Sequence, residues 1–92
     1  MILILGGTTE GRIAAHTLEE AGKPFYYSTK GDEQEVTMHH GIRLQGAMGE
    51  LDMERFCRKQ AIALIIDAAH PFAEQLHRTV EAVSMRLTLP VI

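Results

Sequence analysis

Residues 2–12, Ile-Leu-Ile-Leu-Gly-Gly-Thr-Thr-Glu-Gly-Arg, decide how this chain folds. The first four are apolar and partly β-branched, as expected of a short strand buried on both faces of a parallel sheet. The run stops at Gly6-Gly7, and residues 22–24, Gly-Lys-Pro, supply a later helix stop. We therefore predict a strand that leads directly into a helix, whose apolar positions are Ile13, Ala14, Leu18 and Ala21.

The remaining sequence continues this alternation of strands and helices. Residues 25–29 predict a second strand, residues 42–45 a weaker third and residues 61–66 a fourth. The helix content of the polar stretch 30–41 stays open. A short amphipathic helix is predicted over Leu51, Met53, Phe56 and Cys57, and a long one is predicted from the apolar spacing of Phe72, Leu76, Val80, Val83 and Leu87.

Strands that alternate with helices predict an α/β fold, a Rossmann-like doubly wound parallel sheet with strand order 3-2-1-4-5. Residues 1–92 form one domain, which ends inside a fifth strand that begins at Leu89. We therefore expect the chain to be the front part of a longer protein whose second domain is absent here. The uncovered edge of the fifth strand predicts self-association.

Composition narrows the classes of function. The net charge of −3 offers no basic patch for nucleic acid or anionic lipid. The longest apolar runs fall far short of the roughly 20 residues that span a bilayer, and no basic residue precedes the first one, so we expect a cytoplasmic protein. The single cysteine, Cys57, predicts a core position, and no cluster with metal-ligand spacing occurs.

Two loops converge in the predicted sheet, because strands one and four are neighbours at the switch point. They are residues 6–12 and residues 67–72. Gly6, Gly7 and Gly11 allow the backbone to approach a phosphate, and the following helix N-terminus favours an anion. The alternative is a purely structural glycine turn with Thr8 or Thr9 capping the helix. The loop contains no lysine, which argues against phosphoryl transfer.

The end of the second strand bears on the choice of dinucleotide. Ser28-Thr29-Lys30 would suit the 2′-phosphate of NADP better than the carboxylate that usually holds the ribose of NAD. Asp32 and Glu33 lie close enough to keep NAD as an alternative. A solvated charged loop over residues 30–35 is the other interpretation of this stretch.

Asp67 follows the fourth strand, and His70 stands just before a proline. This pair predicts ligand contact or proton handling in the crevice. The alternative is that Asp67 caps the next helix while His70 bonds a backbone carbonyl. His77, beside Leu76 on the last helix, is expected to face solvent.

The two loops together resemble the precorrin-6A reductase family of cobalamin biosynthesis. Its members show Gly-Gly-Thr-x-Glu-Gly-Arg near the start and Asp-Ala-x-His-Pro-Phe-Ala after the fourth strand, which stand here as residues 6–12 and 67–73. The resemblance covers nearly the whole chain but only about the first half of a family member.

This resemblance implies that NADPH reduces a double bond of the precorrin-6A or cobalt-precorrin-6A macrocycle, held between two Rossmann-like halves. By the resemblance, His70 and Asp67 are the catalytic candidates, with His70 nearest to proton handling. The residues that would contact the cofactor are Gly6, Gly7, Thr8, Glu10, Gly11, Arg12, Ser28, Thr29, Lys30, Asp67, Ala69, His70 and Pro71.

Two other functions stay open at this point. The first is another NAD(P)-dependent oxidoreductase or an epimerase of Rossmann type, which also open with glycine-rich turns. The second is a dinucleotide-binding module without catalytic activity.

Overall fold

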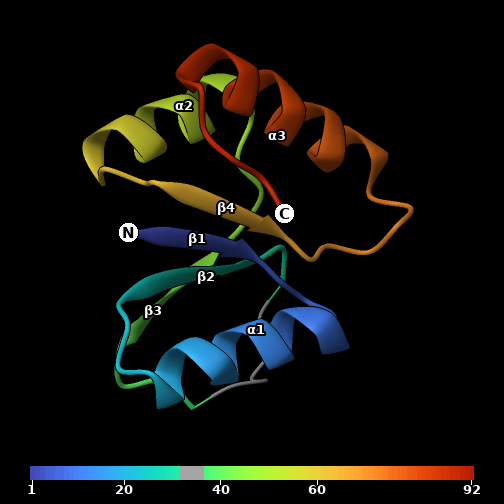
Figure 1. Ribbon diagram of the computed structural model, residues 1–92. Coiled ribbons are helices and arrows are strands. Elements are labelled where there is room, and N and C mark those ends of the chain that lie inside the picture. Colours follow the sequence, from blue (N-terminus) through green and yellow to red (C-terminus); the bar gives the residue numbers. More distant parts are fainter. Residues whose placement is uncertain (32–36) are drawn as a thin grey trace.

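The computed structural model describes residues 1–31 and 37–92. Within these ranges the strands all run parallel in the order β3-β2-β1-β4, which confirms the predicted α/β, Rossmann-like class. The elements are, in chain order, β1 (Ile2–Leu5), α1 (Thr9–Glu20), β2 (Phe25–Thr29), β3 (Gly41–Gln45), α2 (Glu50–Lys59), β4 (Leu64–Asp67) and α3 (Glu74–Leu87) (Figure 1).

Helices cover both faces of the sheet: α1 lies on one face, and α2 and α3 lie on the other (Figure 1). β1 supplies side chains to both cores, because Ile4 packs toward α1 while Leu3 and Leu5 pack toward α2 and α3. This burial on two faces explains why the strand is a continuous apolar run. Cys57 is buried in the α2–α3 core, as predicted.

The chain beyond α3 returns to the sheet beside β4. Val91 forms a parallel bridge with Ile65, and the N–H of Ile92 donates to the carbonyl of Ile65 at 3.0 Å. This pairing is the beginning of the fifth strand in the predicted order. In the described ranges, no helix is long and apolar enough to cross a membrane.

Two element boundaries differ from the sequence prediction. β4 begins at Leu64, because Ala61 has a positive φ of 53° and the N–H of Ile62 donates to Cys57 at 3.0 Å, closing α2 instead. α3 begins at Glu74, and Phe72 is 84% exposed in the turn before it. The apolar spacing therefore predicted a start for α3 at Phe72, two residues before the helix begins.

The predicted inward faces of two helices also need correction. Ile13 is 60% exposed and Leu51 is 63% exposed, although both were placed on apolar faces. α1 packs on the sheet through its smallest residues, Gly11 and Ala15, which are both buried and stand one turn apart. Close approach through these small residues turns Ile13 toward solvent.

A carboxylate on α1 fixes the start of the edge strand β3. One oxygen of Glu19, Oε1, accepts the backbone N–H groups of His39, His40 and Gly41 at 2.7, 2.6 and 2.8 Å. Desolvation would raise the pKa of Glu19, but these three donors outweigh it and the pKa is lowered. Asp32 and Glu33, which kept NAD as an alternative, lie outside the described residues.

Candidate functional site

The two loops predicted to converge meet at the carboxyl edge of the sheet. Leu5 and Asp67 are register partners at the ends of β1 and β4, so the glycine turn (residues 6–12) starts beside the β4–α3 loop (residues 68–73). The hydroxyl of Thr8 donates to the carbonyl of Ala68 and accepts the N–H of Gly11 at 3.1 Å. One side chain therefore joins both loops.

Thr8 is also the N-cap of α1, as the structural alternative for the glycine turn predicts. The cap uses the N–H of Gly11, and the N–H of Gly7 donates to the hydroxyl of Tyr27 at 3.3 Å. No hydrogen bond within the described ranges uses the N–H groups of Thr9 and Glu10. These two donors, at the positive end of the helix dipole, are available to an anion.

Gly6 and Gly11 are required by close packing. A Cβ on Gly6 would lie 2.4 Å from the ring of Tyr27, and a Cβ on Gly11 would lie 2.9 Å from Gly6 Cα. Gly7 has a φ of 96°, which side-chain-bearing residues rarely adopt. Together these constraints bring the backbone of the turn close to the end of β2.

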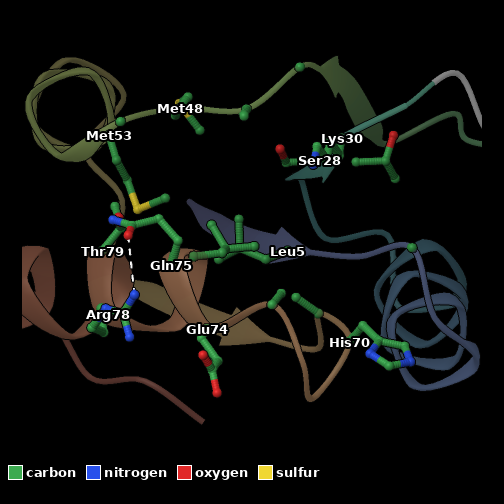
Figure 2. A pocket seen from close by; sticks show the side chains of 18 of the residues that line it. Leu5, Ser28, Lys30, Met48, Met53, His70, Glu74, Gln75, Arg78 and Thr79 are labelled. Atoms are coloured by element: carbon green, nitrogen blue, oxygen red, sulfur yellow. Dashed lines mark hydrogen bonds between the residues drawn. The ribbon is translucent and has the colours of Figure 1, made fainter.

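The main cavity opens at this edge and has a volume of about 810 Å³, within the range of ligand pockets. Figure 2 shows Met53 and Gln75 on one side of it and Ser28 and Lys30 on the opposite side, with Leu5 between them. The walls are formed by the glycine turn, the end of β2, the β3–α2 loop at residues 46–49, the β4–α3 loop and the first turns of α3.

The cavity brings part of the predicted site together. Seven predicted residues line it, namely Gly6, Gly7, Ser28, Thr29, Lys30, Ala69 and His70. A smaller hollow of about 460 Å³ is lined by Thr8, Glu10, Asp67, Ala69 and Pro71, with Ile66, Ala68 and Ile92. Gly11 and Arg12 line neither: Gly11 is buried, and the guanidinium of Arg12 donates to Thr9 Oγ1 at 3.0 Å.

Arg43 is a cation at this edge that the sequence analysis missed. Its Nη2 donates to Thr29 Oγ1 at 3.4 Å, and its Nε is buried with no hydrogen-bond partner among the residues that the structure describes. The register of the parallel sheet would have found it, since Arg43 pairs with Tyr27 and therefore shares a face with Thr29.

His77 does not face solvent as expected. Its Nδ1 lies 2.6 Å from Asp67 Oδ2, and its Nε2 lies 2.9 Å from the carbonyl oxygen of His70. Hydrogen bonding to Asp67 is the largest effect that raises the pKa of His77. The bend of the β4–α3 loop brings the first turn of α3 back over the end of β4.

The alternative roles predicted for Asp67 and His70 were a cap on the next helix and a bond to a backbone carbonyl, and both are wrong. The second oxygen of Asp67 accepts the N–H of Ala69 at 3.3 Å, within the loop, and α3 has no side-chain cap. The exposed ring of His70 accepts the N–H of Phe72 at its Nδ1, at 3.2 Å, and bonds no backbone carbonyl of the described residues. In the described part of the chain, no three His, Cys, Asp or Glu side chains gather as metal ligands would.

Comparison with known proteins identifies the family of this chain. Residues 1–92 match the family described as precorrin-6x reductase CbiJ/CobK. This chain belongs to that family. It is 32% identical over 93 residues to the precorrin-6A reductase of Rhodococcus erythropolis, an alignment that covers 99% of the chain and 38% of that relative.

Two further comparisons support the same CbiJ/CobK family. The chain is 29% identical over 94 residues to the cobalt-precorrin-6A reductase of Synechocystis sp., covering 99% of the chain and 36% of the relative. The solved structure of CobK precorrin-6A reductase matches with a TM-score of 0.86 at 26% identity, over 98% of this chain and 36% of that one. The chain thus spans well under half the length of these family members.

Proposed function

We propose that this chain forms the dinucleotide-binding part of a precorrin-6A reductase and holds NADPH in the main cavity. Membership of the CbiJ/CobK family supports the class of reaction. The observation that carries the binding role is the meeting of the glycine turn with the β4–α3 loop, joined through Thr8. Ligands of open α/β sheets bind at such a switch point.

The residues present fit a dinucleotide phosphate. The N–H groups of Thr9 and Glu10 start α1 with no acceptor in the described chain, and Gly6 and Gly7 line the cavity next to them. Backbone donors at a helix N-terminus bind phosphate without needing a lysine. We therefore assign the pyrophosphate to the glycine turn.

Two cations support NADPH over NADH. Lys30 lines the cavity at the end of β2, and Arg43, which lines neither cavity, donates to Thr29 Oγ1 behind it. Within residues 1–31 and 37–92 the buried Nε of Arg43 has no partner, and a buried donor without an acceptor costs about 1–3 kcal/mol. A 2′-phosphate near Thr29 would give that guanidinium a charged acceptor.

The protein residues mainly orient the reactants in this proposal. Bound NADPH supplies two electrons and one hydrogen to a carbon–carbon double bond of precorrin-6A, or of its cobalt complex, in cobalamin biosynthesis. The reduction also takes up a proton, which solvent water supplies, and we assign to His70 the positioning of that water. Because Nδ1 of His70 accepts the N–H of Phe72, the neutral ring carries its proton on Nε2. Ala69 and Pro71 shape the loop that presents this ring.

Calorimetric titration of NADPH and NADH into the chain tests the binding role. Thr9→Pro removes one available N–H at the first helical position, where proline is tolerated and where Thr8, with φ −132° and ψ 170°, accommodates it. We expect both affinities to fall by about tenfold or more, the size of one charge-assisted hydrogen bond. Thr9→Ala keeps the N–H and should leave both affinities unchanged. Equal effects of the two variants would contradict the phosphate assignment.

Arg43→Met tests the selectivity for NADPH. Loss of a charged contact to phosphate should weaken NADPH by about 10- to 150-fold and leave NADH unchanged. Lys59→Met removes the same charge at the exposed far end of α2 and should have no effect. A loss shared equally by NADPH and NADH would refute the 2′-phosphate contact.

A chimaera tests the reductase role. Residues 1–92 would replace the matching stretch of the Rhodococcus erythropolis precorrin-6A reductase, and NADPH oxidation would be followed with precorrin-6A. We expect activity. A folded chimaera that binds NADPH yet reduces nothing would favour a non-catalytic dinucleotide-binding module instead.

A further inference from the structure

The ring of His77, on α3, lies between a side-chain oxygen at the end of β4 and a backbone oxygen of the β4–α3 loop. Nδ1 is 2.6 Å from Asp67 Oδ2, and Nε2 is 2.9 Å from the His70 carbonyl oxygen. The side chain of Asp67 is only 13% exposed and that of His77 is 33% exposed. His77 itself lines neither cavity, so any influence on the site acts through the residues it holds.

Both ring nitrogens of His77 face atoms that only accept hydrogen bonds. A carboxylate and a backbone carbonyl have no proton to donate, and a neutral imidazole has only one N–H. The doubly protonated ring can donate to both oxygens, whereas the neutral ring must turn a lone pair toward one of them. The observed geometry therefore matches the imidazolium form.

Among the charged groups on the elements around this ring, Asp67 favours the same form. Asp67 faces it from β4, and Glu10 of α1 lines the smaller hollow together with Asp67. On α3, Glu74 and Glu81 stand three residues before and four residues after His77, on the same helix face. Arg78 is the nearest cation in sequence, but it bonds Gln75. From the loop, the His70 carbonyl is the second acceptor and the His70 ring is the other titratable group.

We propose that His77 is a positioning residue, whose imidazolium ties Asp67 at the end of β4 to the His70 carbonyl and so holds the His70 ring at the rim of the main cavity. Thr8 holds the same loop from the other side at Ala68. This inference rests on the proposed function, in which His70 positions the water that supplies the proton, and it assigns to Asp67 the role of orienting His77 rather than of reacting. Deprotonation of His77 would release one of the two bonds and loosen the loop.

The first test needs no cofactor. Long-range ¹H–¹⁵N NMR spectra of the histidine rings are recorded on the chain across pH 5 to 9. We expect both nitrogens of His77 to be protonated at neutral pH, with a midpoint above the ordinary value of 6.5. The Ala69 amide, which donates to Asp67, should shift with that same midpoint. A midpoint at or below 6.5, or no response at Ala69, would overturn the proposal.

The second test measures NADPH affinity against pH. Wild-type affinity should fall by about three- to tenfold as the pH rises through the His77 midpoint, the contribution of one hydrogen bond. His77→Gln should be weaker at low pH and lack that step, whereas His77→Arg, which can donate to both oxygens at any pH, should restore affinity without the step. His16→Gln, an exposed histidine on α1, is the matched control and should keep it.

The two failures can be told apart. If NADPH does not bind at any pH while the NMR midpoints agree, the proposed function fails and the role of His77 in holding the loop stands. If NADPH binds but His77→Gln keeps the wild-type pH step, the positioning role is wrong.

Discussion

Replacing Gly6 with alanine should destabilise the fold through one buried ring. The new Cβ would lie 2.4 Å from two ring carbons of Tyr27, a contact that real structures do not contain. Tyr27 is fully buried in the core beneath α1 and cannot swing away without disturbing that core. Overpacking of this kind costs about 1–3 kcal/mol, and the severity of the clash puts Gly6→Ala at about 2–3 kcal/mol.

That cost converts directly into a melting temperature. At about 2.1 cal/mol/K per residue, a chain of 92 residues unfolds with an entropy of about 190 cal/mol/K. Each kcal/mol then lowers Tm by about 5 °C, so Gly6→Ala should lower it by about 10–15 °C in a thermal scan followed by circular dichroism. Gly49→Ala is the control, because its φ is −76° and, apart from its chain neighbours, no described residue comes within 4 Å of its new Cβ. Its Tm should stay within about 3 °C of wild type.

A double variant distinguishes this clash from general misfolding of Gly6→Ala. Tyr27→Leu removes the ring atoms that the new Cβ would meet, at the cost of a cavity in the core. Combined with Gly6→Ala, it should be less destabilising than the sum of the single variants by at least about 1 kcal/mol. A Tm for Gly6→Ala equal to that of the Gly49→Ala control, or strict additivity in the double variant, would refute the clash.

Four further measurements follow from contacts elsewhere in the chain. Thr8→Val removes the N-cap of α1 and should lower stability by about 1–2 kcal/mol in urea unfolding, while Thr8→Ser should not. Since the pKa of His77 is raised, its stabilising contribution is complete below about pH 6.5 and is lost as the pH rises through the raised value, so the stability gap between wild type and His77→Gln should shrink from pH 6 to pH 9. The lowered pKa of Glu19 gives the opposite sign: its contribution is present above about pH 4.5 and is lost as the pH falls further, which a comparison with Glu19→Ala at pH 5 and pH 3 would detect. Burial raises the pKa of the Cys57 thiol, so labelling by a disulfide reagent should be slow in the native chain and fast in urea; rapid native labelling would contradict the buried position.

The fold was predictable where the ends of a strand are marked by glycine or proline in the sequence itself. The apolar run of β1 ends at a glycine pair, and β2 is bounded by Pro24 and Gly31, so both elements are visible in the sequence. The start of β4 was not, because residues 61–66 are one apolar run. The register that pairs Leu64 with Ile2 leaves residues 61–63 in the connection between α2 and β4, and that pairing depends on contacts distant in sequence.

The candidate site was predictable in its loops but not in its side-chain partners. Sheet order alone brings the glycine turn to the β4–α3 loop. His77 was misplaced because helical periodicity sets its neighbours on α3, while the path of the preceding loop sets what faces it across space. Arg43 was missed because the short third strand shows no clear alternation, and only its register beside β2 turns it toward Thr29.

The double hydrogen bond of Thr8 has a consequence for how much the crevice can change shape. Because one hydroxyl is shared between the start of α1 and the β4–α3 loop, the two walls cannot separate without losing the hydrogen bond from Thr8 to Ala68. The free chain has therefore already lost the loop entropy that closure around a ligand would otherwise cost. Such a crevice should select its ligand by fit to a fixed width, and its association should be limited by encounter rather than by a closing motion.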